Sequence, residues 1–351
     1  MTVRVLASGL DALYLSGTTE LRSSLVSLLD ARRENAAVQG NVHVPLGLGP
    51  DGLTVGWGPW DRYRFRLEHP NALIGLTQSR NLPPIRIQPR AEFLHAVGPQ
   101  GVIEWCDEFA VTVIASPVAW QVSRVDLFAD TQGWDVTATD RRRFAARANS
   151  RRTYEERDDL TGFQWGAGKS VLARIYDKTV EIQKDGKDWW PSIWGNLYDP
   201  TKRVVRTEFQ VKRDALREFG LHTPEQVLAA RPVLWKYLTE NWLSLREFSD
   251  DSNLSRRAVD ADWLAIQNAQ LDSEGIGQDL VRSGSQAGDI RRIIPALVGY
   301  ATRFGALTGA VTLDDLLDAL HDMLVDDERT RGISVEERLH LKAQGLGWAA
   351  P

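Results

Sequence analysis

The stretch LARIYDKTVEI, residues Leu172–Ile182, places Arg174, Tyr176 and Lys178 at every second position. In a β-strand alternate residues share a face, so an extended chain would hold a phenol between two cations. The apolar Ile175 lies between two of these positions and would point to the other face. The stretch therefore predicts a strand with one charged side and one apolar side.

Two further stretches alternate in the same way: QVSRVDLFADTQG (Gln121–Gly133) and RVVRTEFQVKR (Arg203–Arg213). The positions that share the charged side are Arg124, Asp126, Phe128, Asp130, Arg206, Glu208 and Gln210. A sheet with one face packed on helices and the other open to solvent or ligand produces this pattern. The sequence predicts an α+β fold with an antiparallel or mixed sheet, helices on one face and a charged face opposite.

Beyond Arg213 the pattern changes to apolar residues three and four apart, as in TPEQVLAARPVLWKYL and TLDDLLDALHDMLVDDE. That spacing is typical of amphipathic helices, and Thr312 before Leu313 is predicted as an N-cap. We therefore predict a first domain at residues 1–215 and an acidic helical region at residues 216–351, available for dimerisation or contact with a partner.

Charge is unevenly distributed along the 351 residues, which carry a formal net charge of −5. Residues 141–213 hold 17 Lys and Arg against 10 Asp and Glu, whereas both flanking segments are acidic. A basic middle between acidic flanks indicates one anionic partner bound at one place. The alternative is a solvated Arg-rich segment, because RRRFAARANSRR would also suit an exposed helix.

Cys106 is the single cysteine, so no internal disulfide can form and a reducing cytoplasm is the expected compartment. No segment approaches the ~20 apolar residues of a membrane-spanning helix, so we expect no membrane partner.

The six histidines form no H-x-H or H-E-x-x-H pair, which argues against a histidine-based metal site. GFQWGAGKS (Gly162–Ser170) lacks the glycine spacing of a phosphate-binding loop.

Asp126 and Glu208 are carboxylates in the middle of predicted strands, each beside apolar neighbours. A buried carboxylate is costly unless it is paired or binds a metal. If the two strands are neighbours, the pair would make a hard-oxygen site suited to Mg²⁺ or Mn²⁺. The alternative, which the pattern alone favours, is a lattice of salt bridges with Arg124 and Arg206, each two residues away on the same side.

Tyr176 allows two interpretations. A free phenol has a pKa of ~10 and is a poor nucleophile at neutral pH. Two adjacent cations would stabilise its phenolate, and a divalent metal would polarise the phosphoryl oxygen of a group under attack. Those are the requirements of a tyrosine that breaks a DNA strand and keeps its phosphate as a covalent ester. The alternative is a half-buried tyrosine whose hydroxyl reaches water.

Three motifs in order, VSRVDLFAD, ARIYDKTVEIQKDGKDWWPSIWG and VVRTEFQVKRDALREFG, resemble the replication initiation factor family of rolling-circle plasmids and mobile elements. SGLDALYLSG is similar to the opening strand of that family, so the resemblance covers residues 5–220. The family, the Rep_trans group, includes plasmid initiators and relaxases of conjugative elements. The resemblance implies an endonuclease that nicks and rejoins one strand of origin DNA, single-stranded or supercoiled duplex, through a 5′-phosphotyrosine.

The resemblance also implies roles for particular residues. Those that match the family's site are Tyr176 as nucleophile, Arg174 and Lys178 as its basic neighbours, and Asp126 and Glu208 as metal-binding acids. Asp130 and Glu181 are candidates to complete the ligands of Mg²⁺ or Mn²⁺. The residues expected to contact the DNA backbone are Arg141, Arg142, Arg143, Arg151, Arg152, Lys184 and Lys187.

Several alternatives stay open at this stage. Four tryptophans could stack on unpaired bases or form a hydrophobic plug between helix and sheet: Trp165, Trp189, Trp190 and Trp194. The alternative function is a non-catalytic relative that binds an origin or promoter. Initiators and transfer relaxases share the nicking chemistry, so the sequence does not distinguish them. A helicase and a second copy of the chain are further partners that the resemblance suggests.

Overall fold

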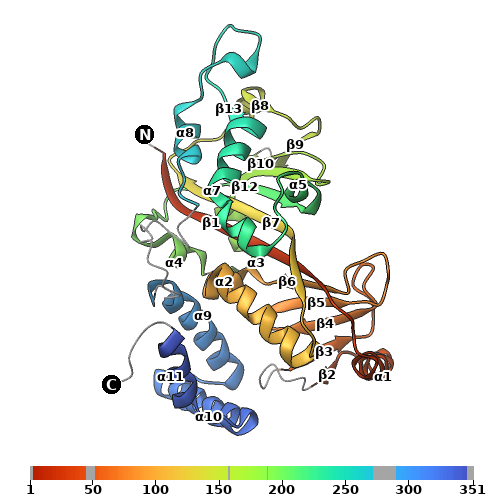
Figure 1. Ribbon diagram of the computed structural model, residues 1–351. Helices are drawn as coiled ribbons and strands as arrows, with labels where there is room; N and C mark the ends of the chain where they lie inside the picture. The colour runs from red at the N-terminus through yellow and green to blue at the C-terminus, as the bar shows by residue number, and fades with distance from the viewer. Residues whose placement is uncertain (1–2, 45–51, 157–158, 188, 272–289, 346–351) are drawn as a thin grey trace. The chain divides into compact units, whose positions relative to one another are not determined.

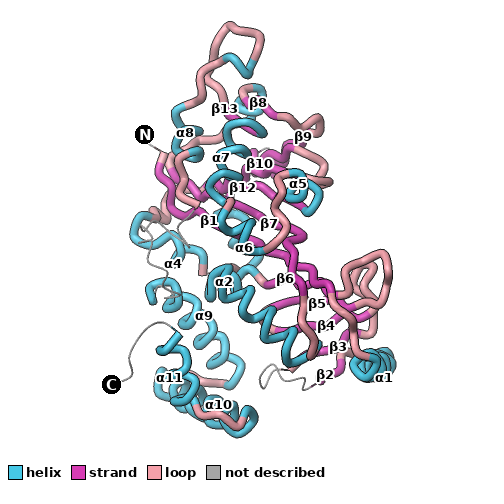
Figure 2. Tube along the Cα trace, viewed as in Figure 1, coloured by secondary structure: helices cyan, strands magenta, loops and turns pink. Residues whose placement is uncertain are grey.

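The computed structural model describes residues 3–44, 52–156, 159–187, 189–271 and 290–345. The chain forms two compact units, each assembled from two stretches of sequence. Unit 1 comprises Met1–Leu15 and Gln121–Leu280, and unit 2 comprises Ser16–Trp120 and Val281–Pro351. Both units contain strands and helices, so the predicted α+β class is confirmed (Figure 1, Figure 2).

Unit 1 is built on an antiparallel sheet with the strand order β1-β7-β12-β11-β10-β9. Its strands are β1 (Arg4–Thr18), β7 (Ala119–Gln132), β12 (Val205–Lys212), β11 (Val171–Asp177), β10 (Asp159–Trp165) and β9 (Arg151–Glu156). A separate pair joins β8 (Phe144–Ala146) to β13 (Leu243–Leu245). The α-helices of this unit are α3 (Lys178–Asp185), α4 (Trp190–Trp194), α5 (Arg213–Glu218), α6 (Pro224–Ala229), α7 (Arg231–Tyr237) and α8 (Ala261–Gln267).

The register of the strands confirms the alternation predicted for three of them. Tyr176 of β11 lies opposite Arg206 of β12, which lies opposite Asp130 of β7. Arg174 lies opposite Glu208 in the next row. Opposite residues of antiparallel strands share a face. The predicted charged face of the sheet is therefore present.

The opposite face of this sheet is apolar and carries much of the core of unit 1. Ile175, Phe209 and Val211 are almost completely buried there. The ring of Phe209 meets Trp235 of α7 edge-on at 5.5 Å between centroids, and Trp242 of the following helical turn at 6.2 Å. The segment that contains α7 therefore covers this face. The sequence predicted helices on one face of the sheet but assigned this segment to a separate helical region.

Helices also cover one end of the charged face, which the sequence did not predict. Phe128 projects from that face and meets Trp190 of α4 edge-on, at 5.6 Å between centroids. Trp194 and Ile182 complete a buried cluster around it. Trp165 is buried elsewhere, against Phe144. Trp165, Trp190 and Trp194 thus form hydrophobic packing, and none of the three is exposed enough to stack on a base.

Strand β11 ends one residue earlier than expected. Asp177 accepts hydrogen bonds from the backbone N–H groups of Thr179 (2.9 Å) and Val180 (3.1 Å) and so caps α3. A carboxylate at this position satisfies donors that the first helical turn leaves without partners. Lys178 is the first residue of α3, and the expectation that it shares the strand face of Tyr176 is wrong.

Unit 2 contains a second antiparallel arrangement, in the order β2-β3-β4-β5-β6, and the C-terminal helices. Its strands are β2 (Val42–Val44), β3 (Leu53–Gly56), β4 (Phe65–His69), β5 (Ala72–Leu76) and β6 (Ile85–Pro89). Its α-helices are α1 (Ser23–Gln39), α2 (Ala91–Phe109), α9 (Ile290–Thr308), α10 (Leu313–Arg331) and α11 (Val335–Gly345). The ring of His69 in β4 lies 5.3 Å from that of Trp105 in α2, so α2 covers one face of these strands.

The two units do not follow the boundary predicted at residue 215. Helices α5 to α8 belong to unit 1, because the apolar face of its sheet needs them as cover, while α9 to α11 belong to unit 2. Thr312 caps α10 as predicted, since its hydroxyl accepts from the backbone N–H of Asp315 at 3.1 Å. A role of residues 216–351 in dimerisation or partner contact stays a prediction. Within the described residues, no helix combines the length and apolar character needed to cross a membrane.

Arg206 of β12 and Asp130 of β7 form an ion pair in which both side chains are 0% exposed, with Arg206 Nε 2.7 Å from Asp130 Oδ1. We expect Arg206→Met to lower the free energy of unfolding by about 3–5 kcal/mol, because Asp130 would keep a buried charge without its cation. Urea denaturation followed by circular dichroism measures this loss.

The double variant Arg206→Met/Asp130→Leu should recover most of that loss, because neither position then carries a buried charge. Arg64→Met is the control, since it breaks a solvent-exposed pair with Asp30 and should cost about 1 kcal/mol or less. Equal effects of Arg206→Met and Arg64→Met would contradict the prediction.

Candidate active site

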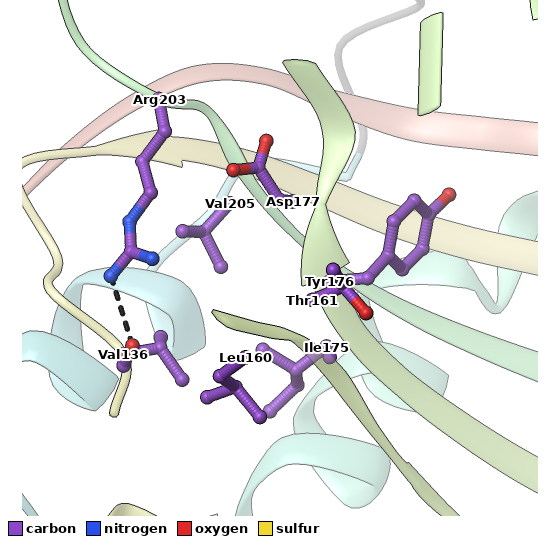
Figure 3. Close-up of a pocket in the computed structure, with 9 residues that line it drawn as sticks. Val136, Leu160, Thr161, Ile175, Tyr176, Asp177, Arg203 and Val205 are labelled. Carbon is purple, nitrogen blue, oxygen red and sulfur yellow. Dashed lines mark hydrogen bonds between the residues drawn. The ribbon is translucent and has the colours of Figure 1, made fainter. Parts of the chain in front are cut away.

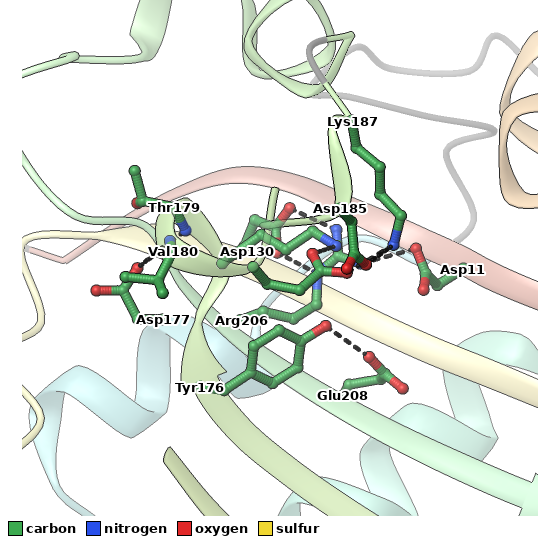
Figure 4. A network of polar contacts seen from close by, with 12 residues as sticks. Asp11, Asp130, Tyr176, Asp177, Thr179, Val180, Asp185, Lys187, Arg206 and Glu208 are labelled. Carbon is green, nitrogen blue, oxygen red and sulfur yellow. Dashed lines mark hydrogen bonds and ion pairs between the residues drawn. The ribbon is translucent and has the colours of Figure 1, made fainter. Parts of the chain in front are cut away.

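Tyr176, near the end of β11, is joined to Glu208 of the neighbouring strand β12 (Figure 4). Its hydroxyl donates a hydrogen bond to Glu208 Oε2 at 3.0 Å, and Arg174 Nη2 donates to Oε1 at 2.7 Å. One carboxylate therefore accepts from a phenol and from a guanidinium that project from the same strand. The side chain of Glu208 is 4% exposed and that of Arg174 is 36% exposed, so the guanidinium borders on solvent.

Asp126 of β7 is the second acid on this face. It lies opposite Gln210, which is two residues after Glu208 in β12 and on the same face. Arg124 binds both of its oxygens, with Nε 2.7 Å from Oδ1. The guanidinium of Arg124 also lies over the ring of Tyr14, 4.8 Å from its centroid. Burial raises the pKa of Asp126 to about 7; Arg124 opposes that rise and the nearby Glu208 carboxylate adds to it. The two acids are therefore close enough to repel each other.

Arg206 joins a third acid to the network from a fully buried position. Its Nε and Nη2 donate to the two oxygens of Asp130 at 2.7 and 2.8 Å, and its Nη1 donates to Asp11 at 2.7 Å. The indole of Trp194 donates to Asp130 as well, at 2.8 Å. Burial disfavours the charge on Arg206, but Asp130 and Asp11 hold its pKa well above the usual value. This part of the network is a structural ion pair.

Lys178 is also buried, against the aromatic rings beside Arg206. Its ammonium lies 4.7 Å from the ring centroid of Trp190 and 5.9 Å from that of Tyr176. It forms an ion pair with Glu181. Burial, and then the charge of Arg206, lower the pKa of Lys178. Lys178 thus supports the ring of Tyr176 from the start of α3.

The surroundings of Tyr176 favour its neutral hydroxyl. Burial raises its pKa well above 10, Glu208 raises it further, and Arg206 lowers it. We expected two adjacent cations to stabilise the phenolate, and the direction found is the opposite, because burial and the carboxylate outweigh the guanidinium. Tyr176 is therefore a hydrogen-bond donor at rest, and Glu208 is placed to accept its proton.

The four acids expected to bind a metal are not assembled into one cluster. In the described part of the chain, no three Asp, Glu, His or Cys side chains are grouped so as to hold a metal ion. Asp130 is engaged by Arg206 and Glu181 by lysines. Asp126 and Glu208 lie on the same face of neighbouring strands, Asp126 opposite Gln210 and Glu208 opposite Phe128, and both supply hard oxygen donors. The residues present fit a site with these two carboxylates, to which other ligands would add.

The basic residues expected to contact DNA all lie in unit 1 but differ in their surroundings. Five are exposed to solvent: Arg141, Arg142, Arg151, Arg152 and Lys184. Arg143 is half-buried, donates to Asp140 at 2.6 Å and forms a second ion pair with Asp260, so it joins segments of the fold. Lys187 is half-buried and pairs with Glu181 at 2.6 Å. A role of these seven residues in DNA binding stays a prediction.

Sequence reasoning missed two members of the network, Asp11 and Trp194. Asp11 interrupts the apolar strand β1 in the way that Asp126 interrupts β7, so the same signal could have found it. Its partner Arg206 is 195 positions away in the chain. The indole of Trp194 carried no comparable signal, because only the packing of α4 brings it to Asp130.

A pocket lies on the other side of the sheet from these charged groups. Ile175, Val205, Arg203 and the base of Tyr176 contribute to its lining, and Figure 3 shows the Tyr176 hydroxyl pointing away from it. Arg203 donates to the carbonyl oxygen of Val136 at 2.9 Å. The reactive groups therefore face the charged side of the sheet and not this pocket.

No protein-family model matches this chain, and no curated protein matches it. Among solved structures, the rolling circle replication initiator protein from Geobacillus stearothermophilus is similar over 75% of this chain and 94% of its own, with a TM-score of 0.43 and 14% identity. At this level of similarity we draw no functional conclusion from it, and the function is inferred from the site.

The raised pKa of Asp126 predicts how one part of the stability depends on pH. The folded value of about 7 lies above the ordinary value of 3.8, so the folded chain binds more protons at this position. The contribution of Asp126 to the free energy of unfolding is then largest below about pH 4 and falls as the pH rises to about 7.

The free energy of unfolding of wild type minus that of Asp126→Asn should decrease over that range. Urea titrations at several pH values measure this difference. Asp135→Asn removes the same charge from a side chain that is 90% exposed and serves as the control. A difference that grows with pH would show that Asp126 is ionised throughout and that Arg124 outweighs burial.

Proposed function

We propose that this chain is a tyrosine DNA strand transferase that nicks and rejoins one strand at an origin, as a rolling-circle replication initiator or relaxase. The observation that carries the proposal is the hydrogen bond from the Tyr176 hydroxyl to Glu208, on a sheet face that also presents Asp126 and the half-exposed Arg174. A phenol, an acceptor for its proton and a cation for phosphate are the elements that this transesterification requires.

The chemistry proposed at Tyr176 balances as follows. Glu208 accepts the phenolic proton while the Tyr176 oxygen attacks the phosphorus of one phosphodiester. The bond from phosphorus to the 3′ oxygen breaks, and that oxygen takes a proton from water to become a 3′-hydroxyl. The 5′ phosphate stays on the tyrosine as an ester. In the reverse step the 3′-hydroxyl attacks this ester, the strand is rejoined and the phenol regains its proton.

The arginines around Tyr176 supply the electrostatic part of the proposal. Arg174 is partly exposed and bound to Glu208 at 2.7 Å, so it can turn one edge to an incoming phosphate. Arg206 is fixed behind the phenol by Asp130 and Asp11, and its charge opposes the rise in the pKa of Tyr176. Preorganised cations of this kind stabilise charge that develops during phosphoryl transfer.

Asp126 and Glu208 would hold the divalent metal, Mg²⁺ or Mn²⁺, that the chemistry of their oxygens suits. When bound, such an ion polarises a phosphoryl oxygen. Arg124 and Arg174 neutralise the two carboxylates. Both guanidinium groups are partly exposed, so they could also face the phosphates of the DNA.

The exposed cations of unit 1 extend the proposal to origin DNA as the partner, in the cytoplasm. Salt should weaken such backbone contacts steeply. A helicase and a second copy of the chain are further proposed partners, for residues 216–351. A second candidate function is a non-catalytic DNA-binding relative. The observation that favours it is that each acid of the site is paired with a cation while burial keeps Tyr176 neutral.

Substitution of Tyr176 distinguishes the strand transferase from the non-catalytic DNA-binding protein. The wild type, with Mn²⁺ and single-stranded oligonucleotides that tile its own replicon, should form a covalent protein–DNA adduct that survives denaturing electrophoresis. Tyr176→Phe should form none, because it lacks the attacking oxygen. Glu208→Gln should slow adduct formation by about 10²–10⁴-fold, since it removes the proton acceptor.

Tyr154→Phe is the matched control, because Tyr154 of β9 is an exposed tyrosine whose hydroxyl donates to Gln164 at 3.0 Å. It should form the adduct at the wild-type rate. An adduct that persists in Tyr176→Phe would remove Tyr176 as nucleophile. DNA binding by the wild type and Tyr176→Phe, with cleavage by neither, would establish the non-catalytic alternative.

A further inference from the structure

The outer face of the unit 2 strands carries a row of arginines separated by glycines. The register pairs Gly56 with Arg66, Arg66 with Gly75, and Gly75 with Arg86. Opposite residues of antiparallel strands share a face, so these four positions form one line across β3 to β6. The neighbouring Leu67 is 0% exposed and points to the other face, which α2 covers. The row therefore lies on the side away from that core.

A tight hairpin is packed onto this face above Gly75. Trp60 and Tyr63 exchange two backbone hydrogen bonds of 3.0 and 2.9 Å. A Cβ atom at Gly75 would lie 2.7 Å from Tyr63 Cγ and 3.0 Å from Trp60 Cε3, so glycine is what lets both rings rest on the sheet. The guanidinium of Arg86 lies 4.3 Å from the Trp60 ring centroid. Asp61, at the tip, has φ 55°, a strained value for a residue with a side chain.

The hairpin and the strand after it present an aromatic ring and several cations to solvent. Trp57 is 64% exposed, although tryptophan is highly buried on average. Arg62, Arg64 and Arg66 follow at every second position, and the side chains of the last two are 49% and 45% exposed. Residues 57–66 therefore present one exposed indole and exposed guanidinium groups, which can stack on a ring and bind an anion.

The carboxylates on this face hold the arginines only weakly. Asp30, Asp61 and Glu68 pair with Arg64, Arg86 and Arg66 at 2.6, 3.3 and 2.5 Å. These pairs are exposed to water, where an ion pair contributes about 1 kcal/mol or less. A phosphate can therefore replace each carboxylate at small cost.

We infer that this face, formed by Trp57, Trp60, Arg62, Arg64, Arg66 and Arg86, binds single-stranded DNA. Arginines spaced along the segment before β4 and within it can follow a phosphate backbone, and an exposed indole can stack on an unpaired base. A duplex keeps its bases stacked on one another and offers no free base to Trp57. The inference rests on the proposed function for the identity of the nucleic acid and adds a binding surface made by unit 2 alone.

The test measures binding of a fluorescein-labelled oligothymidylate by anisotropy over a range of salt concentrations, with every variant made in the full-length Tyr176→Phe chain so that no strand is cut. Trp57→Ala should weaken binding about fivefold or more, because stacking of one base is worth about 1–3 kcal/mol. Trp57→Phe keeps an aromatic face and should restore most of the affinity. Arg62→Glu and Arg66→Glu should each weaken binding and flatten the slope of log affinity against log salt by about 0.7.

Arg329→Glu is the charge control, because Arg329 of α10 is 77% exposed and, like Arg64 and Arg86, lies near an aspartate. It should leave affinity and salt slope unchanged. Affinity that is the same in Trp57→Ala, Arg62→Glu and Arg66→Glu as in the parent would overturn the inference. The inference would also be overturned if duplex DNA bound as tightly as the oligothymidylate and Trp57→Ala changed neither affinity.

The same variants, made with Tyr176 intact, separate this inference from the proposed function. If the chain with Tyr176 intact forms no adduct but its face variants lose oligothymidylate binding, the binding surface of unit 2 is supported and the proposed nicking activity is rejected. If the wild type forms the adduct and the face variants bind oligothymidylate as the parent does, the binding surface of unit 2 is rejected and the proposed nicking activity is supported.

Discussion

The contact between Arg206 and Asp130 is the constraint on which the charged face of unit 1 depends. Both side chains are excluded from solvent, so neither charge is tolerated without the other. The same guanidinium binds Asp11 and lies 4.1 Å from the ring centroid of Trp190, which ties β1, β7 and α4 to β12. Tyr176 lies directly opposite Arg206 in the register, so the ion pair also sets where the phenol stands.

The site combines buried acids with cations that border on solvent. Burial alone would protonate Asp126, and Arg124 offsets part of that cost. Glu208 is held from one side by Arg174 and from the other by the phenol of Tyr176. The acceptor of the phenolic proton is thus in place before any substrate binds. A neutral tyrosine with a fixed acceptor costs less to keep buried than a phenolate would.

The arginines of unit 2 show why charge counted along a sequence is a poor guide to charge on a surface. They lie in residues 1–140, whose overall balance is acidic, whereas the basic balance that indicated an anionic partner lies in residues 141–213. Strand pairing brings Arg66 and Arg86 to one face, with Gly75 between them. Three acids of the segment, Asp30, Asp61 and Glu68, pair with arginines of this face, and the other acids of residues 1–140 add to its negative balance.

The sequence by itself determined the alternation of β7, β11 and β12, because period-two patterning is a local property that the pleat turns into two faces. It also identified Tyr176, Asp126 and Glu208 as members of one face. Only the tertiary structure decided that Lys178 begins a helix, since Asp177 caps α3 instead of continuing the strand. Only it decided that Arg206 pairs with Asp130 and Asp11 and that Arg174 pairs with Glu208, whereas the sequence had already offered Arg124 as the partner of Asp126. The physical reason is distance along the chain: such pairings depend on strand register and helix packing between segments up to 195 positions apart, which no local pattern encodes.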